Sequence, residues 1–93
     1  MNLIKALIFI LLIQLPLLAG EADELMTKAN KLYQEDKFDE AIVLYETILN
    51  NGLESEKLYY NLGNSYYRMG QIGKAILNYE RGLKLDQIGR AHV

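Results

Sequence analysis

Residues 58–86 read "LYYNLGNSYYRMGQIGKAILNYERGLKLD" and contain two successive helical patterns. Apolar or small residues recur in the first half at i, i+3, i+4 and i+7, the spacing that places one stripe along a helix. These residues are Tyr59, Leu62, Gly63 and Tyr66. Gly70 follows and can adopt the left-handed conformation that ends a helix. A second stripe then begins, so the stretch predicts two helices packed as an antiparallel hairpin.

The same pattern occurs twice in the chain, at an offset of 34 residues. Identical pairs at this offset are Asn30 and Asn64, Tyr33 and Tyr67, Ala41 and Ala75, Ile42 and Ile76, Tyr45 and Tyr79, Glu46 and Glu80, and Leu49 and Leu83. A repeat of this length is typical of helical hairpins that stack on one another. We therefore expect an all-α fold, an α-solenoid fragment of four helices. The expected helices span residues 22–35, 38–50, 56–69 and 72–85, and Ser55 is the expected N-cap of the third.

Small residues within the predicted helices indicate close helix contacts. Glycine inside a helix costs about 1 kcal/mol relative to alanine, so Gly63 needs a compensating contact. We expect the two backbones to meet at Gly63 and Ala75, with tyrosines filling the space on either side. The residues predicted to pack the repeats are Ala29, Ala41, Tyr45, Tyr59, Leu62, Gly63, Tyr66, Ala75 and Tyr79. The last helix is expected to expose Ile76, Leu83 and Leu85.

The period, the helix pairs and the key positions together resemble the tetratricopeptide repeat (TPR). The positions that carry this resemblance are Tyr59, Leu62, Gly63, Tyr66, Ala75, Tyr79 and Gly82. The first unit is looser, because Lys28 stands where Leu is usual and Asp36 where Gly is usual. The resemblance implies tandem TPR hairpins at residues 21–54 and 55–87. It also implies a non-enzymatic module that binds protein or peptide partners.

A narrower resemblance connects residues 58–86 with the TPR protein of bacterial Bat (aerotolerance) operons. Members of that family carry their repeats outside the cytoplasm, followed by membrane-spanning helices and often by an SH3-like module. Neither of these later parts occurs in this sequence. The resemblance implies a scaffold in the bacterial cell envelope with a role in aerotolerance or stress.

Residues 1–20 form a leader that differs in composition from the rest of the chain. Lys5 is its only charge, and an apolar run extends from Ala6 to Leu18. This run of about 13 residues is shorter than the roughly 20 that a membrane-spanning helix needs. We expect a signal helix that is cleaved after export, so that the repeats are extracytoplasmic, periplasmic or membrane-associated. An uncleaved anchor and a buried core helix are the alternatives.

Residues 88–93, "IGRAHV", do not continue the repeat pattern. The codons ATC GGA AGA GCA CAC GTC encode this peptide and, preceded by AG, spell the start of a widely used short-read sequencing adapter. The same frame explains Gln87, because a genuine C followed by AG makes CAG, and the repeat pattern expects Pro at this position. We therefore expect a truncated protein with a non-native tail that includes His92. A genuine irregular C-terminus is the alternative.

Composition excludes several classes of function. The chain has no cysteine, which removes disulfides and thiolate metal sites. Residues 21–87 hold 12 acidic and 8 basic side chains without a basic cluster, so we expect no nucleic acid partner. The acids Glu35, Asp36, Asp39 and Glu40 could suggest a metal or acid–base site, but at a turn between helices they are expected to be solvated. We predict no catalytic residue, metal or cofactor.

A second stripe on the first helix of each repeat predicts a binding groove. First helices line the concave surface of stacked hairpins, so the two stripes should lie side by side. The predicted groove residues are Met26, Asn30, Tyr33, Gln34, Tyr60, Asn64, Tyr67 and Arg68. Aromatic anchors, an amide and an arginine suit recognition of a peptide. Alternatively, Asn64 and Tyr67 only help adjacent repeats to stack.

Two classes of function remain open. The first is a non-enzymatic scaffold that organises partner proteins and associates with the membrane through the N-terminal segment or a missing C-terminal part. The second is a substrate-holding TPR domain of a larger envelope enzyme or assembly machine whose remainder is missing.

Overall fold

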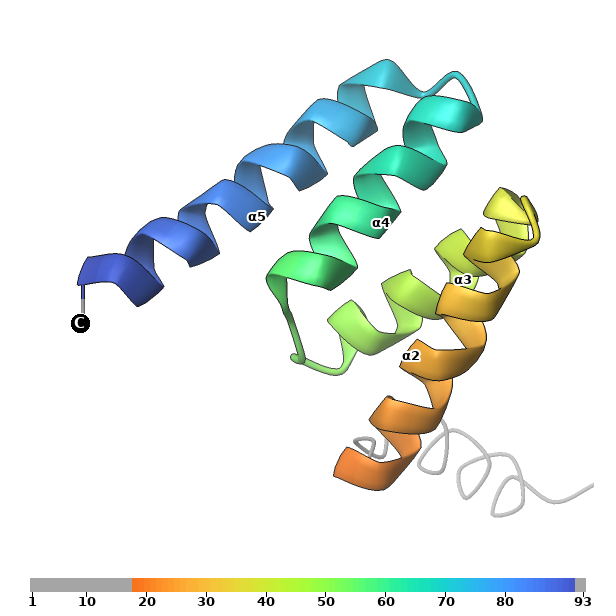
Figure 1. The fold of residues 1–93 in the computed structure, drawn as a ribbon, viewed down its shortest axis with the longest axis horizontal. Coiled ribbons are helices and arrows are strands. Elements are labelled where there is room, and N and C mark those ends of the chain that lie inside the picture. Colours follow the sequence, from red (N-terminus) through yellow and green to blue (C-terminus); the bar gives the residue numbers. More distant parts are fainter. Residues whose placement is uncertain (1–17, 92–93) are drawn as a thin grey trace, which may run out of the picture.

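The computed structural model describes residues 18–91, which form two antiparallel helical hairpins (Figure 1). Helices α2 (Ala19–Gln34) and α3 (Phe38–Asn50) make the first hairpin, and α4 (Glu56–Arg68) and α5 (Ile72–Ala91) make the second. Helix α4 contacts both helices of the first hairpin, while α5 packs along α4. The described part of the chain therefore confirms the predicted all-α, four-helix, TPR-like arrangement. Residues 1–17 of the predicted signal helix lie outside the described residues.

The three turns that follow α2, α3 and α4 share one conformation. After α4, Gly70 has φ +80°, and the amides of Gly70 and Gln71 donate to the carbonyls of Tyr67 and Tyr66. This is the Schellman pattern, in which a left-handed residue satisfies the last free carbonyls of a helix. The predicted role of Gly70 is thus confirmed. After α2, Asp36 occupies the equivalent left-handed position with φ 62°.

The predicted helix boundaries are correct for α3, are one residue too long at the ends of α2 and α4, and need larger corrections at two other ends. Helix α2 begins at Ala19 rather than at residue 22, because Ala22 donates to the Leu18 carbonyl at 3.0 Å and closes a further turn. Helix α5 continues to Ala91 rather than ending at residue 85. Gln87 can continue a helix, and Asp86 pairs with Arg90 one turn later at 3.1 Å.

Ser55 is the N-cap of α4, as predicted. Its Oγ accepts a hydrogen bond from the Leu58 amide at 3.0 Å. This bond satisfies one of the amides that a helix start leaves without an intrahelical partner. The cap fixes the point at which the chain enters the second hairpin.

One hydrophobic core runs through both hairpins. Its buried members are Ala29, Ala41, Tyr45, Ile48, Leu58, Tyr59, Leu62, Tyr66 and Ala75. Helix α4 lies at the centre of this core and contributes the largest share of its residues. The stability of each hairpin therefore depends on the other.

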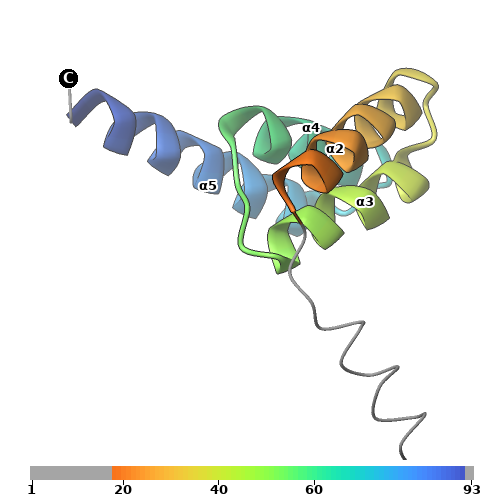
Figure 2. The ribbon, with the colours of Figure 1, turned by 90° about the horizontal axis from the view of Figure 1, so that it is seen from below.

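Helix α5 extends past the other helices and leaves one face open (Figures 1 and 2). Ile76 and Leu83 on this helix are exposed, as expected. Leu85 does not follow the expectation, because it packs against the core from the side of α5 that also carries buried Asn78, seven residues earlier. No helix within residues 18–91 is long and apolar enough to span a membrane.

Candidate functional site

A tyrosine-to-asparagine hydrogen bond joins the two helices of each hairpin. In the first hairpin, the Tyr45 hydroxyl donates to Asn30 Oδ1 at 2.6 Å. In the second, the Tyr79 hydroxyl donates to Asn64 Oδ1 in the same way. All four residues are related by the 34-residue offset of the repeat. The repeated spacing of Asn and Tyr within the chain thus produces the same polar contact twice.

Two amides on α4 connect the hairpins to each other. Asn61 Nδ2 lies 3.1 Å from Asn30 Oδ1 and 3.2 Å from the Tyr45 hydroxyl. Asn64 Nδ2 donates to the Tyr33 hydroxyl at 3.0 Å. Both contacts cross from the second repeat to the first. Asn30, Tyr33 and Asn64, which the sequence places in the groove, are therefore engaged in holding the repeats together.

Three other predicted groove residues lie at the carboxyl ends of α2 and α4. We call the surface that carries the eight predicted groove residues the α2–α4 surface. Tyr67 has 59% of its surface exposed, and Gln34 and Arg68 are also exposed. The Arg68 guanidinium lies over the ring of Phe38, 4.7 Å from its centroid. Within residues 18–91, Arg68 forms no ion pair with a carboxylate. Its charge therefore remains able to bind an anionic group.

Phe38 supports this end of the surface. It is buried at the start of α3, and its ring meets that of Tyr33 edge to face, with centroids 5.6 Å apart. Edge-to-face contacts of this kind fix the orientation of both rings. The Arg68 guanidinium thus packs on an aromatic ring whose orientation is fixed.

The other end of the surface consists of Met26 and Tyr60. Met26 is partly buried and packs against the core. Tyr60 is 61% exposed and lies beside the ring of Tyr79, with centroids 6.2 Å apart. The eight predicted groove residues therefore do not form one uniform surface. They divide into an exposed arginine–tyrosine end, a hydrogen-bonded middle and a mixed apolar end.

The residues predicted to pack the repeats occupy the interior, with Tyr79 the least buried of them. Gly63 lies directly beneath the Tyr79 ring. A Cβ at position 63 would be 2.6 Å from Tyr79 Cε1 and 3.2 Å from the Ala75 carbonyl oxygen. The lack of a side chain at Gly63 is therefore what allows α4 and α5 to approach.

Sequence reasoning missed Asn61 and Ser65. Both are buried on α4, and the Ser65 hydroxyl donates to the Asn61 carbonyl at 2.7 Å. They lie on the side of α4 that faces the first hairpin. A signal was present in the sequence, since Leu58, Asn61, Leu62 and Ser65 follow the i, i+3, i+4, i+7 spacing of a second buried stripe.

Two tyrosines on α4 pair with glutamates at the opposite side of the molecule. The Tyr59 hydroxyl donates to Glu54 at 2.7 Å, and the Tyr66 hydroxyl donates to Glu46 at 2.8 Å. Burial, together with the neighbouring carboxylate, raises the pKa of each tyrosine to about 12. These hydroxyls therefore stay protonated near neutral pH and act as structural donors.

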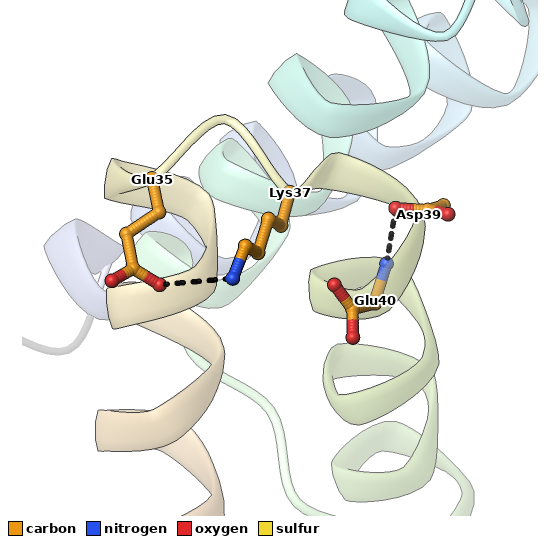
Figure 3. A network of polar contacts seen from close by, with 4 residues as sticks. All are labelled: Glu35, Lys37, Asp39 and Glu40. Atoms are coloured by element: carbon orange, nitrogen blue, oxygen red, sulfur yellow. Dashed lines mark hydrogen bonds and ion pairs between the residues drawn. The ribbon is translucent and has the colours of Figure 1, made fainter.

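The acidic corner between α2 and α3 has local partners (Figure 3). Glu35 lies 3.9 Å from Lys37 Nζ, and Asp39 accepts a hydrogen bond from the Glu40 amide at 2.9 Å. All four side chains are exposed. No group of three or more potential ligands for a metal ion occurs in the part of the chain that the structure describes.

Comparison with known protein families matches residues 56–87 to the tetratricopeptide repeat. The matched segment comprises α4 and most of α5. Comparisons with curated proteins and with solved structures found no match. The TPR match at residues 56–87 indicates a protein–protein interaction module, and repeats of this family are typically non-catalytic.

Proposed function

We propose that this chain is an interaction module that binds a carboxylate-bearing segment of a partner protein at the exposed end of the α2–α4 surface. The observation that carries the proposal is the pair formed by Arg68 and Tyr67. Arg68 is exposed but held over Phe38, and Tyr67, its neighbour in sequence, is also exposed. A pre-positioned guanidinium and an exposed aromatic ring suit recognition of an acidic side chain or a C-terminal carboxylate.

The hydrogen-bonded middle of the surface has a positioning role in this proposal. Asn64 Oδ1 accepts a hydrogen bond from the Tyr79 hydroxyl, and Asn64 Nδ2 donates one to the Tyr33 hydroxyl. A partner backbone would have to displace these bonds to use Asn64 as its main contact. The proposed contacts are therefore Tyr67, Arg68 and Gln34, while the asparagines keep the two helices aligned.

A selection experiment with random peptides tests the proposed site and does not require a named partner. A display library is selected on the full chain, and retained peptides are then presented to the Arg68→Gln and Tyr67→Ala variants. We expect selected peptides to be rich in acidic residues and to be lost from both variants. Retention by Val43→Ala is the control, because Val43 is similarly exposed on α3. Peptides retained equally by all variants would contradict the proposed site.

We further propose that the module acts outside the cytoplasm in the cell envelope, with a role in aerotolerance or stress. The apolar leader and the Bat-type resemblance support this location. Alkaline phosphatase fused after residue 93 gives a test, because this enzyme needs disulfides that form only outside the reducing cytoplasm. We expect activity from the fusion and none after deletion of residues 6–18. Activity unchanged by the deletion would argue against export by the leader.

A further inference from the structure

The turn between α3 and α4 is the covalent link between the two hairpins (Figure 1). It begins with Asn51 and Gly52, and the sequence has no other asparagine that is followed by glycine. Glycine has no side chain, so its backbone nitrogen is unhindered. In such a pair this nitrogen can attack the side-chain amide of the preceding asparagine. The link between the hairpins therefore carries a pair of residues with a reactivity of its own.

The reaction is the loss of ammonia from Asn51, and water is its only co-reactant. A bond forms between the Gly52 nitrogen and Asn51 Cγ, and the bond between Cγ and Nδ2 breaks. The leaving nitrogen takes up the proton that the Gly52 amide gives up and departs as ammonia. Water then opens the cyclic imide at either of its carbonyls. The product is an aspartate or an isoaspartate, whose main chain runs through Cβ, and nothing is oxidised or reduced.

The folded turn keeps the two reacting groups apart. Asn51 has φ −93° and ψ 10°. At this ψ the Gly52 nitrogen lies on the side of the Asn51 backbone nitrogen, rotated away from Cβ, and cannot reach Cγ. The Gly52 amide also donates to the Leu49 carbonyl at 2.9 Å, and Asn51 Nδ2 donates to the Thr47 carbonyl at 2.8 Å. The attacking nitrogen and the leaving nitrogen are thus both bonded to α3.

The bonds that hold this turn are at the surface. Gly52 and Leu53 are exposed, and the Leu53 amide donates to the Ile48 carbonyl at 3.4 Å, which is long for such a bond. Exposed segments of this kind open locally at a lower free energy than the core requires. A local opening is enough to free the Gly52 amide and to let ψ of Asn51 rotate. Reaction at Asn51 therefore does not require the whole chain to unfold.

We propose that Asn51 is a site of spontaneous deamidation that the folded turn suppresses, and that its conversion loosens the link between the two hairpins. The turns after α2 and α4 have the same left-handed conformation at Asp36 and Gly70, but Glu35 and Met69 precede these residues. Of the three turns, only the one that joins the hairpins carries the reactive pair. The proposal does not depend on peptide binding at Arg68.

Both products of the reaction disturb the turn. An aspartate at position 51 cannot donate to the Thr47 carbonyl, and its charge lies at the carboxyl end of α3, where the helix dipole disfavours an anion. In an isoaspartate the main chain gains one atom between positions 51 and 52. The amides of Gly52 and Leu53 are then displaced from the carbonyls that they bond in the folded turn. Either product weakens the connection through which α4 is held against α3.

The test of the site follows the conversion of every asparagine in the full chain by peptide mapping and mass spectrometry. The chain is kept in buffer, in urea below the unfolding transition and in urea that unfolds it. We expect Asn51 to convert before any other asparagine in the unfolded chain, and at least about tenfold more slowly in buffer. Urea below the transition should raise the rate at Asn51. Equal rates in buffer and in unfolding urea, or faster conversion of another asparagine in the unfolded chain, would overturn the proposed site.

The test of the loosening compares Asn51→Asp with Asn50→Asp. The two variants add the same charge at the end of α3, but Asn50 is exposed and the Thr47 carbonyl keeps its donor in the second variant. We expect a lower urea midpoint for Asn51→Asp than for Asn50→Asp. If Asn51→Asp does not fold, the unmodified chain is aged in urea and refolded, and its deamidated form, separated by charge, replaces the variant. Equal midpoints would overturn the proposed loosening.

Discussion

The Tyr45 hydroxyl donates to Asn30 Oδ1 across 2.6 Å, and this bond lies beneath α4 where water cannot reach Tyr45. Tyr79 and Asn64 form the same bond at the open end of the molecule, where Tyr79 is only partly buried. The repeat thus places one interaction in two environments. Two hydrogen bonds between the same groups contribute differently to stability if the groups left unpaired can reach water in one case and not in the other.

Removal of the two hydroxyls should therefore have unequal effects. We expect Tyr45→Phe to lower the free energy of unfolding by about 1–2 kcal/mol, because Asn30 loses a buried donor and keeps only Asn61. Tyr79→Phe should cost about 0.5 kcal/mol, since water can reach Asn64. Urea denaturation measures both values. A larger loss for Tyr79→Phe would contradict the dependence of this bond on burial.

Addition of one methyl group at Gly63 tests the close approach of α4 and α5. The Tyr79 ring and the Ala75 carbonyl would both have to move, so Gly63→Ala should destabilise the chain by about 1–2 kcal/mol despite the better helix propensity of alanine. Gly73→Ala is the matched control, because nothing lies within 4 Å of a Cβ there. It should leave stability unchanged or raise it. Thermal unfolding of both variants distinguishes packing from propensity.

Asp36 should be replaceable by glycine with a gain in stability. Its φ of 62° lies in the left-handed region that glycine adopts at Gly70 and Gly52. We expect Asp36→Gly to raise the free energy of unfolding by about 0.5–1 kcal/mol and Gly70→Ala to lower it by about 1–2 kcal/mol. Denaturant unfolding of the two variants provides the comparison. A loss in Asp36→Gly would mean that the Asp36 side chain contributes more than its strained backbone costs.

Alkaline pH should destabilise the fold through Tyr59 and Tyr66. Burial and the adjacent glutamates raise the pKa of each hydroxyl from 10 in the unfolded chain to about 12 in the folded one. The folded state therefore holds more protons between pH 10 and 12, so the stability present below pH 10 is lost across this range. Urea midpoints from pH 8 to 12 measure the effect. The decline should be shallower in Tyr66→Phe, and equal slopes would contradict this assignment.

The sequence predicts most of the fold because its determinants are local or periodic. Gly70 predicts the turn after α4, and Ser55 predicts the cap of α4, because each acts within a few residues. The 34-residue offset predicts the two hairpins, because it is visible in the sequence. The end of α5 does not follow from the family pattern, because Gln87 stands at the position of the helix-breaking Pro. The predicted end at residue 85 is wrong for this reason.

The candidate site is less predictable because it depends on contacts between repeats. The sequence leaves two roles open for Asn64, contact with a peptide or stacking of adjacent repeats, and in the structure its amide meets Tyr33 from the neighbouring repeat. The sequence predicts that Arg68 can bind a carboxylate. It does not predict that the guanidinium packs on the Phe38 ring, because this contact depends on how α3 approaches α4. Spacing along one helix identifies a face. It does not identify which side chains on that face are already bonded to another helix.

The most direct test of the proposed binding site is the energetic coupling between Arg68 and the carboxylate of a selected peptide. The dissociation constants of an acidic peptide and its amide analogue are measured for the unmodified chain, Arg68→Gln and, as a charge-matched control, Arg81→Gln. Each single change, at Arg68 or in the peptide, should weaken binding about tenfold, which corresponds to about 1.4 kcal/mol. The two changes together should cost no more than one alone, and Arg81→Gln should show no coupling. Fully additive losses would contradict a contact between Arg68 and the partner carboxylate.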